Sequence, residues 1–535
     1  MQQKRNKPNP RFSGEPAGEK KRGKNGKSVK AKDYFLNRKG VSEKTIKEIN
    51  REKAALAAAK SEAEKSAKLS TKSSARSSAK SSAKYAGGVN ENKKIDENRY
   101  LVTPSRYDEN FKGVATVGSC EIIVNGAIVG EREEVEVIRK RGTSFYADFS
   151  RTDAPSADRR EVKCKNFLSC GNCAFLHLNY EKQLEIKREA VKNAVTPYFV
   201  DVPETVSLGE FGYRNKAHLA FAEIDRRLIL GFFDDVTRAV IPVKDCLLHA
   251  EWFKKASAII LEWARERHFH AYNPRTGKGL LRYALLRKLG NGLMLTLVVN
   301  GGKLSGTESL YSALKEQFEK VSFYTCENKS ASSAVLSGKL RKEHGEDYLE
   351  GEMLGVKFTL SPDSFFQINE KVAELIYSEV LSAIKNSPAE NVVDCFSGIG
   401  ITSALFALSG KRVTSIEISP SAVRDAKRIG ALNGLSGHIS YLRGDAAKLL
   451  PKIGNAENSV FFVDPPRSGL GEKTALTITG FAPREIIYLS CNPITLKEDI
   501  KTIIENGYKI VSATPFDLFP ETKHVETLVR FEKKK

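Results

Sequence analysis

The sequence predicts a multi-domain protein in which a small β-barrel, a central α+β domain and a Rossmann-like α/β domain follow one another. Short β-like runs separated by Gly and polar residues lie between Phe111 and Phe149. Mixed helical and strand patterns follow from about residue 160, and strands alternate with helices after Ser361. A chain of 535 residues is long enough for several hydrophobic cores. We therefore predict domains at 99–158, 159–360 and 361–535, preceded by a tail at 1–98.

The tail is basic and of low complexity. Residues 1–99 carry 27 Lys+Arg against 11 Asp+Glu, so they account for most of the formal net charge of +21. A Ser/Ala/Lys repeat occupies Ser73–Lys84, and Ser42–Leu69 has helix formers without an apolar stripe. Such composition predicts disorder, with a solvated helix at Ser42–Leu69. Two functions fit the tail, tethering to RNA or ribosomes and simple solubilisation.

The first predicted domain is an OB-like antiparallel barrel. Its β-like runs include Gly113–Val117, Glu121–Ile123 and Val135–Ile138, and turn residues such as Asn125-Gly126 separate them. Barrels of this kind often bind RNA, although some serve only as packing units. We favour an RNA contact.

The later domains are predicted from their longer elements. A helix is expected at Tyr180–Val195, followed by strands at His218–Phe221, Leu228–Phe233 and Leu293–Val299. After Ser361, strands are expected at Asn391–Asp394, Arg412–Ile416, Val460–Val463 and Ile486–Ser490, with helical stretches such as Ile401–Leu408 between them. This alternation is typical of a doubly wound, mainly parallel sheet.

Composition argues against a membrane or secreted protein. No window holds 18 consecutive apolar residues, and the basic start has no apolar signal core. Eight cysteines in this length do not form a disulfide scaffold. We expect a cytoplasmic protein in a reducing compartment.

A nucleoside cofactor is indicated by the segment Val392–Gly400. It reads as a strand, a Gly-containing turn and a helix start, and glycines there let the backbone approach a ligand. Glu417, at the end of the next strand, is suited to hold ribose hydroxyls. Asp445 suits either an adenine contact or a helix N-cap. The turn by itself does not distinguish a dinucleotide from S-adenosylmethionine.

Three further segments carry candidate catalytic groups. Phe462–Gly469 is a strand end followed by Asp464 and a rigid Pro-Pro turn, Tyr488–Pro493 places Cys491 past the next strand, and Phe516–Glu526 ends in a carboxylate.

These groups together suit methylation of uracil at carbon-5. That carbon is a poor nucleophile until a thiolate adds to carbon-6, and cysteine is the side chain suited to this addition. A general base must afterwards remove the carbon-5 proton. We predict Cys491 as the nucleophile and Glu526 as the base, with Asp464 orienting the uracil or the cysteine.

Asp464-Pro-Pro-Arg-x-Gly, Ser490-Cys-Asn-Pro and His524-x-Glu526 resemble the motifs of the RNA uracil-5 methyltransferase family. Ser361–Asn369 resembles the segment that this family has ahead of its cofactor turn. The resemblance covers roughly residues 105–535. It implies S-adenosylmethionine as methyl donor, a target base flipped out of its stack, and a TRAM-type RNA-binding barrel at the start.

The resemblance also implies residue roles. Cys491 matches the nucleophile and Glu526 the base. Cofactor contacts are implied for Gln367, Phe396, Glu417, Asp445 and Asp464. At Ile401 similar sequences often have a polar residue, so no role is assigned there. Glu521 stands where they often have an amide, which leaves its local hydrogen bonds open.

A cysteine cluster distinguishes two branches of this family. Cys164, Cys170, Cys173 and Cys246 are four potential thiolate ligands, and four thiolates suit zinc or an iron–sulfur cluster. Members that act on ribosomal RNA resemble this pattern and carry a 4Fe–4S cluster, whereas transfer-RNA members lack it. The resemblance therefore favours 4Fe–4S over zinc. Cys120, Cys326 and Cys395 have no partners in the sequence and are expected to be core or neutral positions.

We therefore predict a monomeric enzyme that methylates a uridine of 23S ribosomal RNA. The alternatives are a transfer-RNA uracil-5 methyltransferase, an RNA cytosine-5 methyltransferase, which also uses a cysteine at carbon-6, and a non-catalytic RNA-binding iron–sulfur protein.

Overall fold

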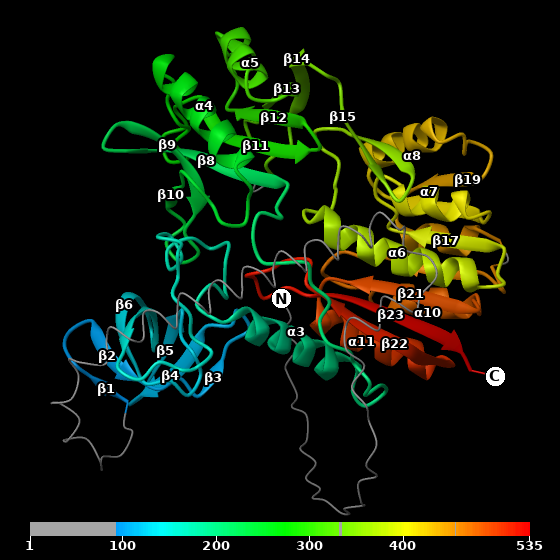
Figure 1. The fold of residues 1–535 in the computed structure, drawn as a ribbon, viewed down its shortest axis with the longest axis horizontal. Helices are drawn as coiled ribbons and strands as arrows, with labels where there is room; N and C mark the ends of the chain where they lie inside the picture. Colours follow the sequence, from blue (N-terminus) through cyan, green and yellow to red (C-terminus); the bar gives the residue numbers. More distant parts are fainter. Residues whose placement is uncertain (1–91, 331–333, 455, 535) are drawn as a thin grey trace, which may run out of the picture. The chain divides into compact units, whose positions relative to one another are not determined.

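The computed structural model describes residues 92–330, 334–454 and 456–534, all of which belong to one unit spanning 40–535. Residues 1–91 of the predicted tail, with the helix expected at Ser42–Leu69, lie outside the described residues. Three seven-stranded sheets and a two-stranded hairpin form the described part (Figure 1). No helix described there is both long and apolar enough to cross a membrane.

The first sheet contains the strands predicted between Phe111 and Phe149. Its order is β1-β2-β6-β7-β5-β4-β3, antiparallel except where β5 runs parallel to β7. Alternate side chains point inward, among them Ile122, Val124 and Val135. The strands are β1 (Lys93–Lys94), β2 (Arg99–Val102), β3 (Arg106–Tyr107), β4 (Gly113–Val117), β5 (Cys120–Asn125), β6 (Glu133–Arg141) and β7 (Ser144–Thr152).

The middle sheet has one long apolar face. Its order is β10-β9-β8-β11-β12-β13-β14, and only β12 and β13 are parallel. Helices α4 and α5 contribute to the hydrophobic core of this sheet. The elements are β8 (Lys216–Ile224), β9 (Arg227–Phe233), β10 (Val240–Pro242), α4 (Trp252–Glu266), β11 (Leu281–Leu289), β12 (Gly292–Val299), α5 (Thr307–Lys315), β13 (Lys320–Glu327) and β14 (Lys339–Gly345).

The third sheet is the Rossmann-like sheet that the alternation after Ser361 predicts. Its order is β19-β18-β17-β20-β21-β23-β22, parallel through β21 and antiparallel at β23. The strands are β17 (Asn391–Cys395), β18 (Arg412–Glu417), β19 (Ile439–Arg443), β20 (Val460–Val463), β21 (Glu485–Ser490), β22 (Tyr508–Phe516) and β23 (Glu526–Lys533).

Apolar side chains cover both faces of this sheet, because neighbouring residues of a strand point in opposite directions. Val392 and Phe462 pack with α6, α7 and α8, whereas Val393 and Phe461 pack with α3, α10 and α11. Figure 1 shows α6 and α7 beside the sheet. The helices and the short 3-10 turn are α3 (Tyr180–Val195), α6 (Glu370–Asn386), α7 (Ile401–Leu408), α8 (Pro420–Leu432), α9 (Ala446–Leu449), η1 (Leu450–Lys452), α10 (Glu472–Gly480) and α11 (Pro493–Glu505).

Two elements from the predicted central span pack against the Rossmann-like sheet. Helix α3 contacts α11 and β22, and the hairpin of β15 (Leu349–Met353) and β16 (Val356–Leu360) contacts α7 and α8. Val191 and Phe358 belong to the two cores of that sheet. The division of the chain at 158 and 360 stays a prediction.

Candidate active site

Strand pairing brings Cys491 and Glu526 together. In the antiparallel pair β21–β23, Ser490 is the partner of Thr527. Cys491 follows Ser490 and Glu526 precedes Thr527, so the next position of the same register places the thiol opposite the carboxyl group. The two residues are 35 positions apart in the sequence, and a central strand pair joins them.

Asp464 lies at the same edge of the sheet. It follows β20, which is parallel to β21 with Val463 beside Tyr488. In parallel sheets the carboxyl ends of the strands form the ligand-binding edge. The structure therefore brings the three predicted catalytic residues, Cys491, Glu526 and Asp464, to one edge.

The Pro-Pro turn after Asp464 is held by a residue that the sequence did not single out, Asp499 on α11. Its carboxylate accepts hydrogen bonds from Leu470 N (2.8 Å), Gly471 N (3.0 Å) and the Tyr488 hydroxyl (2.6 Å). Gly469 has a φ of +76°, and a Cβ there would lie 2.5 Å from Asp499 Oδ2. Only glycine combines that backbone with this close approach.

Burial raises the pKa of the catalytic thiol and of the carboxyl group opposite it. Burial, followed by the charges of Glu526 and Asp464, raises the pKa of Cys491 to about 11, while Arg467 opposes the shift. Burial and the charge of Asp464 raise the pKa of Glu526 well above its usual value. Among the described residues, Glu526 Oε2 has no hydrogen-bond partner. The Cys491 thiol is therefore protonated at neutral pH, and burial favours the protonated form of the carboxyl group opposite it.

Arg467 and His524 form a second pair at this edge. Burial, with the charges of Arg467 and Lys523, lowers the pKa of His524 to about 3, so its ring is neutral. Because an arginine only donates, Arg467 Nη2 donates to His524 Nε2 over 3.1 Å. Arg467 also lowers the pKa of both Cys491 and Glu526. The sequence marked Arg467 only as part of a motif.

A small cavity of about 50 Å³ lies beside the Gly turn. Three of the five predicted cofactor residues, Gln367, Phe396 and Asp464, line it, together with Tyr377. Gly400, with a φ of +81°, packs against Ala426, which a Cβ would approach to 2.8 Å. This close packing holds the turn between β17 and α7 near the cavity.

Glu417 and Asp445 are not among the residues that line this cavity. Glu417 is held at the turn, since its carboxylate accepts from Gly398 N (3.0 Å) and Ser419 N (2.7 Å). Asp445 caps α9 by accepting from Ala447 N over 2.9 Å. The helix-cap alternative for Asp445 is therefore present in the structure, and its cofactor contact stays a prediction.

Asp394 is a buried acid at the end of β17 that the sequence did not assign. Its Oδ2 accepts from Thr402 Oγ1 (2.7 Å) and Ser403 Oγ (2.5 Å). Burial raises its pKa to about 7, and its charge contributes to the raised pKa of Asp464, also about 7. A carboxyl group directly before a Gly turn was the available sequence signal.

The loop before Glu526 is held by buried charges. Lys187 of α3 donates to Asp517 Oδ1 (2.6 Å) and to Phe519 O (3.0 Å), and the Tyr180 hydroxyl donates to Asp517 Oδ2 (2.8 Å). Lys187 and Asp517 are 1% and 0% exposed. Sequence reasoning missed both, because a lysine on an otherwise polar helix normally points to solvent.

The hydrogen bonds of Glu521, left open by the sequence, are also resolved. Its carboxylate is fully buried and accepts from Arg160 Nη2 (2.6 Å) and Gln183 Nε2 (3.2 Å). Burial raises its pKa to about 7, against the lowering effect of Arg160. A carboxylate thus replaces the usual amide beside a guanidinium partner.

The four predicted metal-binding cysteines lie near one another. Burial raises the pKa of Cys170, Cys173 and Cys246, and each is raised further by the charge of another cysteine of the set, including Cys164. Arg214 lowers all three pKa values. Within the ranges that the structure describes, no three His, Cys, Asp or Glu side chains are arranged to hold a metal ion.

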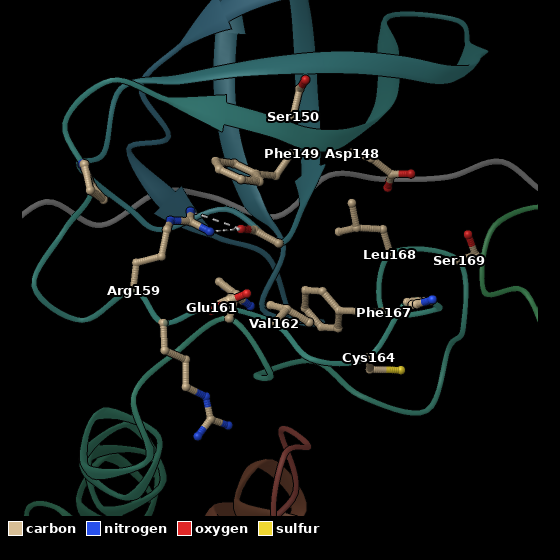
Figure 2. Close-up of a pocket in the computed structure, with 15 residues that line it drawn as sticks. Asp148, Phe149, Ser150, Arg159, Glu161, Val162, Cys164, Phe167, Leu168 and Ser169 are labelled. Carbon is tan, nitrogen blue, oxygen red and sulfur yellow. Dashed lines mark hydrogen bonds between the residues drawn. The ribbon is translucent and has the colours of Figure 1, made fainter. Parts of the chain in front are cut away.

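A larger cavity of about 740 Å³ separates the cysteine segment from the first sheet. Figure 2 shows Phe149 on the strand above it and Cys164 and Phe167 on the loop below. The Arg159 guanidinium lies 3.9 Å from the centre of the Phe149 ring and is paired with the buried Glu131 and Glu133.

Known proteins match this chain over most of its length. The model of the tRNA (uracil-5-)-methyltransferase family matches residues 451–534, and that of RNA cap guanine-N2 methyltransferases matches 389–475. An uncharacterized RNA methyltransferase of Halalkalibacterium halodurans is 30% identical over 83% of this chain and 98% of its own. Another, from Caldanaerobacter subterraneus subsp. tengcongensis, is 33% identical over 81% of this chain and 99% of its own.

A solved structure has the same fold. The tRNA (uracil-54, C5)-methyltransferase of Pyrococcus abyssi, crystallised with S-adenosyl-L-homocysteine, superposes with a TM-score of 0.67 at 24% identity, over 81% of this chain and 99% of its own.

A Rossmann-like sheet with a Gly turn beside a cavity, and a thiol–carboxyl pair at the same edge, form an architecture that a methyltransferase can use. The matches over 389–534 and the full-length relatives agree with that class. Within this class, the chain belongs to the family of RNA methyltransferases that these relatives represent, and its residues 451–534 match the model of the tRNA (uracil-5-)-methyltransferases.

Proposed function

We propose that this protein methylates carbon-5 of a uracil in 23S ribosomal RNA, with Cys491 as nucleophile and Glu526 as general base. The register that pairs Ser490 with Thr527 carries the proposal, because it sets a thiol opposite a carboxyl group at the ligand-binding edge. Carbon-6 and carbon-5 of uracil are adjacent atoms. A nucleophile and a base facing each other can therefore act on the two in turn.

The proposed reaction runs through a covalent bond between Cys491 and the uracil ring. The Cys491 thiol loses its proton to solvent, its sulfur forms a bond to carbon-6, and the electrons of the 5,6 double bond move to the enolate. Carbon-5 then takes a methyl group, which S-adenosylmethionine would supply as an electrophile when bound, with S-adenosylhomocysteine as the leaving group. Glu526 removes the carbon-5 proton, the double bond reforms, and the bond from carbon-6 to sulfur breaks. Cys491 is returned unchanged.

Cys491 and Glu526 both have raised pKa values. Cys491 has to lose a proton and Glu526 has to be ionised before it can accept one. Arg467 favours both ionised forms, so we assign it the role of stabilising the charged site during the reaction. Asp464 is proposed to orient the uracil ring.

The methyl donor is proposed to lie along the Gly turn. Gln367, Phe396 and Asp464 would contact it from the cavity that they line, and Glu417 would hold its ribose. Asp445 is proposed to contact the adenine with the carboxylate oxygen that does not cap α9.

Release of tritium from RNA carrying tritium at carbon-5 of uridine tests the reaction. The wild-type protein and Cys326→Ala, which alters a cysteine in the core of the middle sheet, should both release it. Cys491→Ala should release none. Release only from labelled cytidine would favour the cytosine-5 alternative, and cellular RNA methylation unchanged by Cys491→Ala would favour a non-catalytic protein.

The proposal that 23S ribosomal RNA is the substrate depends on the four cysteines. We propose that Cys164, Cys170, Cys173 and Cys246 hold a 4Fe–4S cluster with a structural or RNA-positioning role, as their gathering near Arg214 supports. The first sheet is proposed to be an OB-like, TRAM-type RNA-binding barrel, and the protein is proposed to act as a monomer.

Two measurements test the proposed cluster and the proposed RNA substrate. Absorbance near 400 nm with four irons per chain in anaerobically purified protein is expected, whereas stoichiometric zinc without iron would contradict the cluster. Mapping of 5-methyluridine in a strain lacking this protein should reveal a missing site in 23S ribosomal RNA. A missing site in transfer RNA would instead support the alternative that the solved Pyrococcus abyssi enzyme represents.

A further inference from the structure

The segment that follows Cys173 forms hydrogen bonds with the loop that leads to Glu526. The Glu521 carbonyl accepts hydrogen bonds from Ala174 N (2.8 Å) and Phe175 N (3.1 Å). Glu521 has a φ of +67°, a left-handed backbone that residues other than glycine rarely adopt. Such a conformation persists only where surrounding contacts impose it, and these two bonds are among those contacts.

The Glu521 side chain is held by the same segment. Arg160, which donates to its Oε1, also donates from Nε to Leu176 O (3.0 Å). Gln183, which donates to its Oε2, also donates to Phe175 O (3.1 Å) and Leu178 O (3.0 Å). Backbone and carboxylate of Glu521 are therefore both tied to residues 174–178.

Further contacts fix the loop on either side of Glu521. The Tyr213 hydroxyl donates to Pro520 O over 3.0 Å, and Thr522 N donates to Phe519 O over 3.2 Å. Lys523 Nζ donates to Glu109 O (3.0 Å) and Asn110 Oδ1 (2.6 Å) in the turn between β3 and β4. Hydrogen bonds thus hold the chain on both sides of Glu521. Because the stretch from Glu521 to Glu526 is short, a shift of Glu521 would also displace His524 and Glu526.

We propose that Glu521 is a positioning residue that, together with Ala174–Leu178, fixes the Glu526 carboxyl beside Cys491. It does not touch the reacting atoms. Its effect is on the catalytic step, because a misplacement of a catalytic group by about 1 Å can cost on the order of 100-fold in rate. The proposal rests on the proposed function for its kinetic test, but its structural test does not.

The kinetic test compares three variants. Glu521→Ala should lower kcat on the order of 100-fold with KM for RNA unchanged. Glu521→Gln keeps an oxygen that accepts from Arg160 and should retain kcat within a few-fold. A double variant, Arg160→Met with Glu521→Leu, removes the buried carboxylate and its guanidinium partner together and leaves only the partly exposed Glu210 without that partner. It should therefore recover thermal stability relative to Glu521→Ala while kcat stays low.

Arg530→Met is the matched control. Arg530 pairs with Glu485 over 2.9 Å in the same sheet, far along β21 and β23 from Cys491 and Glu526. This variant should lower the melting temperature without lowering kcat. Recovery of kcat together with stability in the double variant would reduce Glu521 to a structural role and overturn the proposal.

Hydrogen exchange separates this proposal from the reaction itself. In Glu521→Ala without RNA, amides of 522–526 should exchange faster while those of α7 stay as in the wild type. Unchanged exchange at 522–526 would overturn the positioning role even if kcat fell. Absence of tritium release from the wild-type protein would instead refute the proposed function and leave the exchange result standing.

Discussion

Lys187→Met tests the buried charges that anchor the catalytic loop. The Lys187 ammonium lies 2.6 Å from Asp517, both side chains are at most 1% exposed, and methionine has nearly the same length. Removing one partner of a buried pair costs about 3–5 kcal/mol, because the remaining charge stays buried. Within the described part of the chain, Asp517 would retain only the Tyr180 hydroxyl as a side-chain hydrogen-bond partner, so the upper part of that range applies.

Hydrogen exchange at α3 and β22 measures this cost locally. Both tryptophans of the chain, Trp252 and Trp263, lie in α4 on the middle sheet, so their fluorescence in urea reports a region that should not change. Lys192→Met is the control on the same helix, because Lys192 pairs with Glu189 at the surface, where pairs contribute about 0–1 kcal/mol.

The double variant Lys187→Met with Asp517→Leu removes both charges and should return close to wild-type stability, since apolar replacement of a buried pair is often neutral. A loss below about 1 kcal/mol for Lys187→Met alone would place the pair in the exposed class. That result would refute the reasoning, as would equal losses for Lys187→Met and Lys192→Met.

Three further predictions concern the active-site edge. Because the pKa of Cys491 is about 11, its rate of alkylation by iodoacetamide should rise roughly tenfold per pH unit between pH 7 and 10. Peptide mass spectrometry measures this rate. A plateau at pH 8 would contradict the raised pKa. Glu526→Gln should accumulate a methylated protein–RNA adduct that resists denaturing electrophoresis, because carbon-5 keeps its proton; free turnover by this variant would remove Glu526 from the base role. Gly469→Ala should lower the free energy of unfolding by more than about 1–2 kcal/mol and abolish activity, since its Cβ meets Asp499. Gly507→Ala is the control, because Gly507 has a similar φ and open space around it. In urea unfolding this control should lose only the cost of a left-handed backbone at alanine.

Much of the Rossmann-like sheet could be predicted because its strands are buried on both faces and read as continuous apolar runs. The expected bounds at Val460–Val463 and Ile401–Leu408 agree with β20 and α7, and α3 agrees with Tyr180–Val195. In the first sheet, β6 is longer than the expected Val135–Ile138. The prediction missed its far end because that end is exposed and carries charged residues. Apolar patterning cannot detect such an end.

The site was predictable where motifs carry the chemistry, and not where long-range contacts do. Cys491, Glu526 and Asp464 meet at one edge because strand ends gather there. Asp499 and Lys187 act through partners far away in the sequence, and neither belongs to a motif. Pairings between distant side chains leave no local pattern, so only the folded chain reveals them.

The place of β23 in the sheet bears on when activity arises during folding. β23 follows β22 in sequence but lies between β22 and β21 in the sheet, so it covers the edge of β21 that would otherwise be unpaired. Until it docks, the edge of β21 is open and Cys491 has no carboxyl group opposite it. A chain caught at that stage would carry an exposed nucleophile without its base. Competence for the reaction therefore requires the pairing of β23 with β21, which joins Ser490 to Thr527 across the sheet.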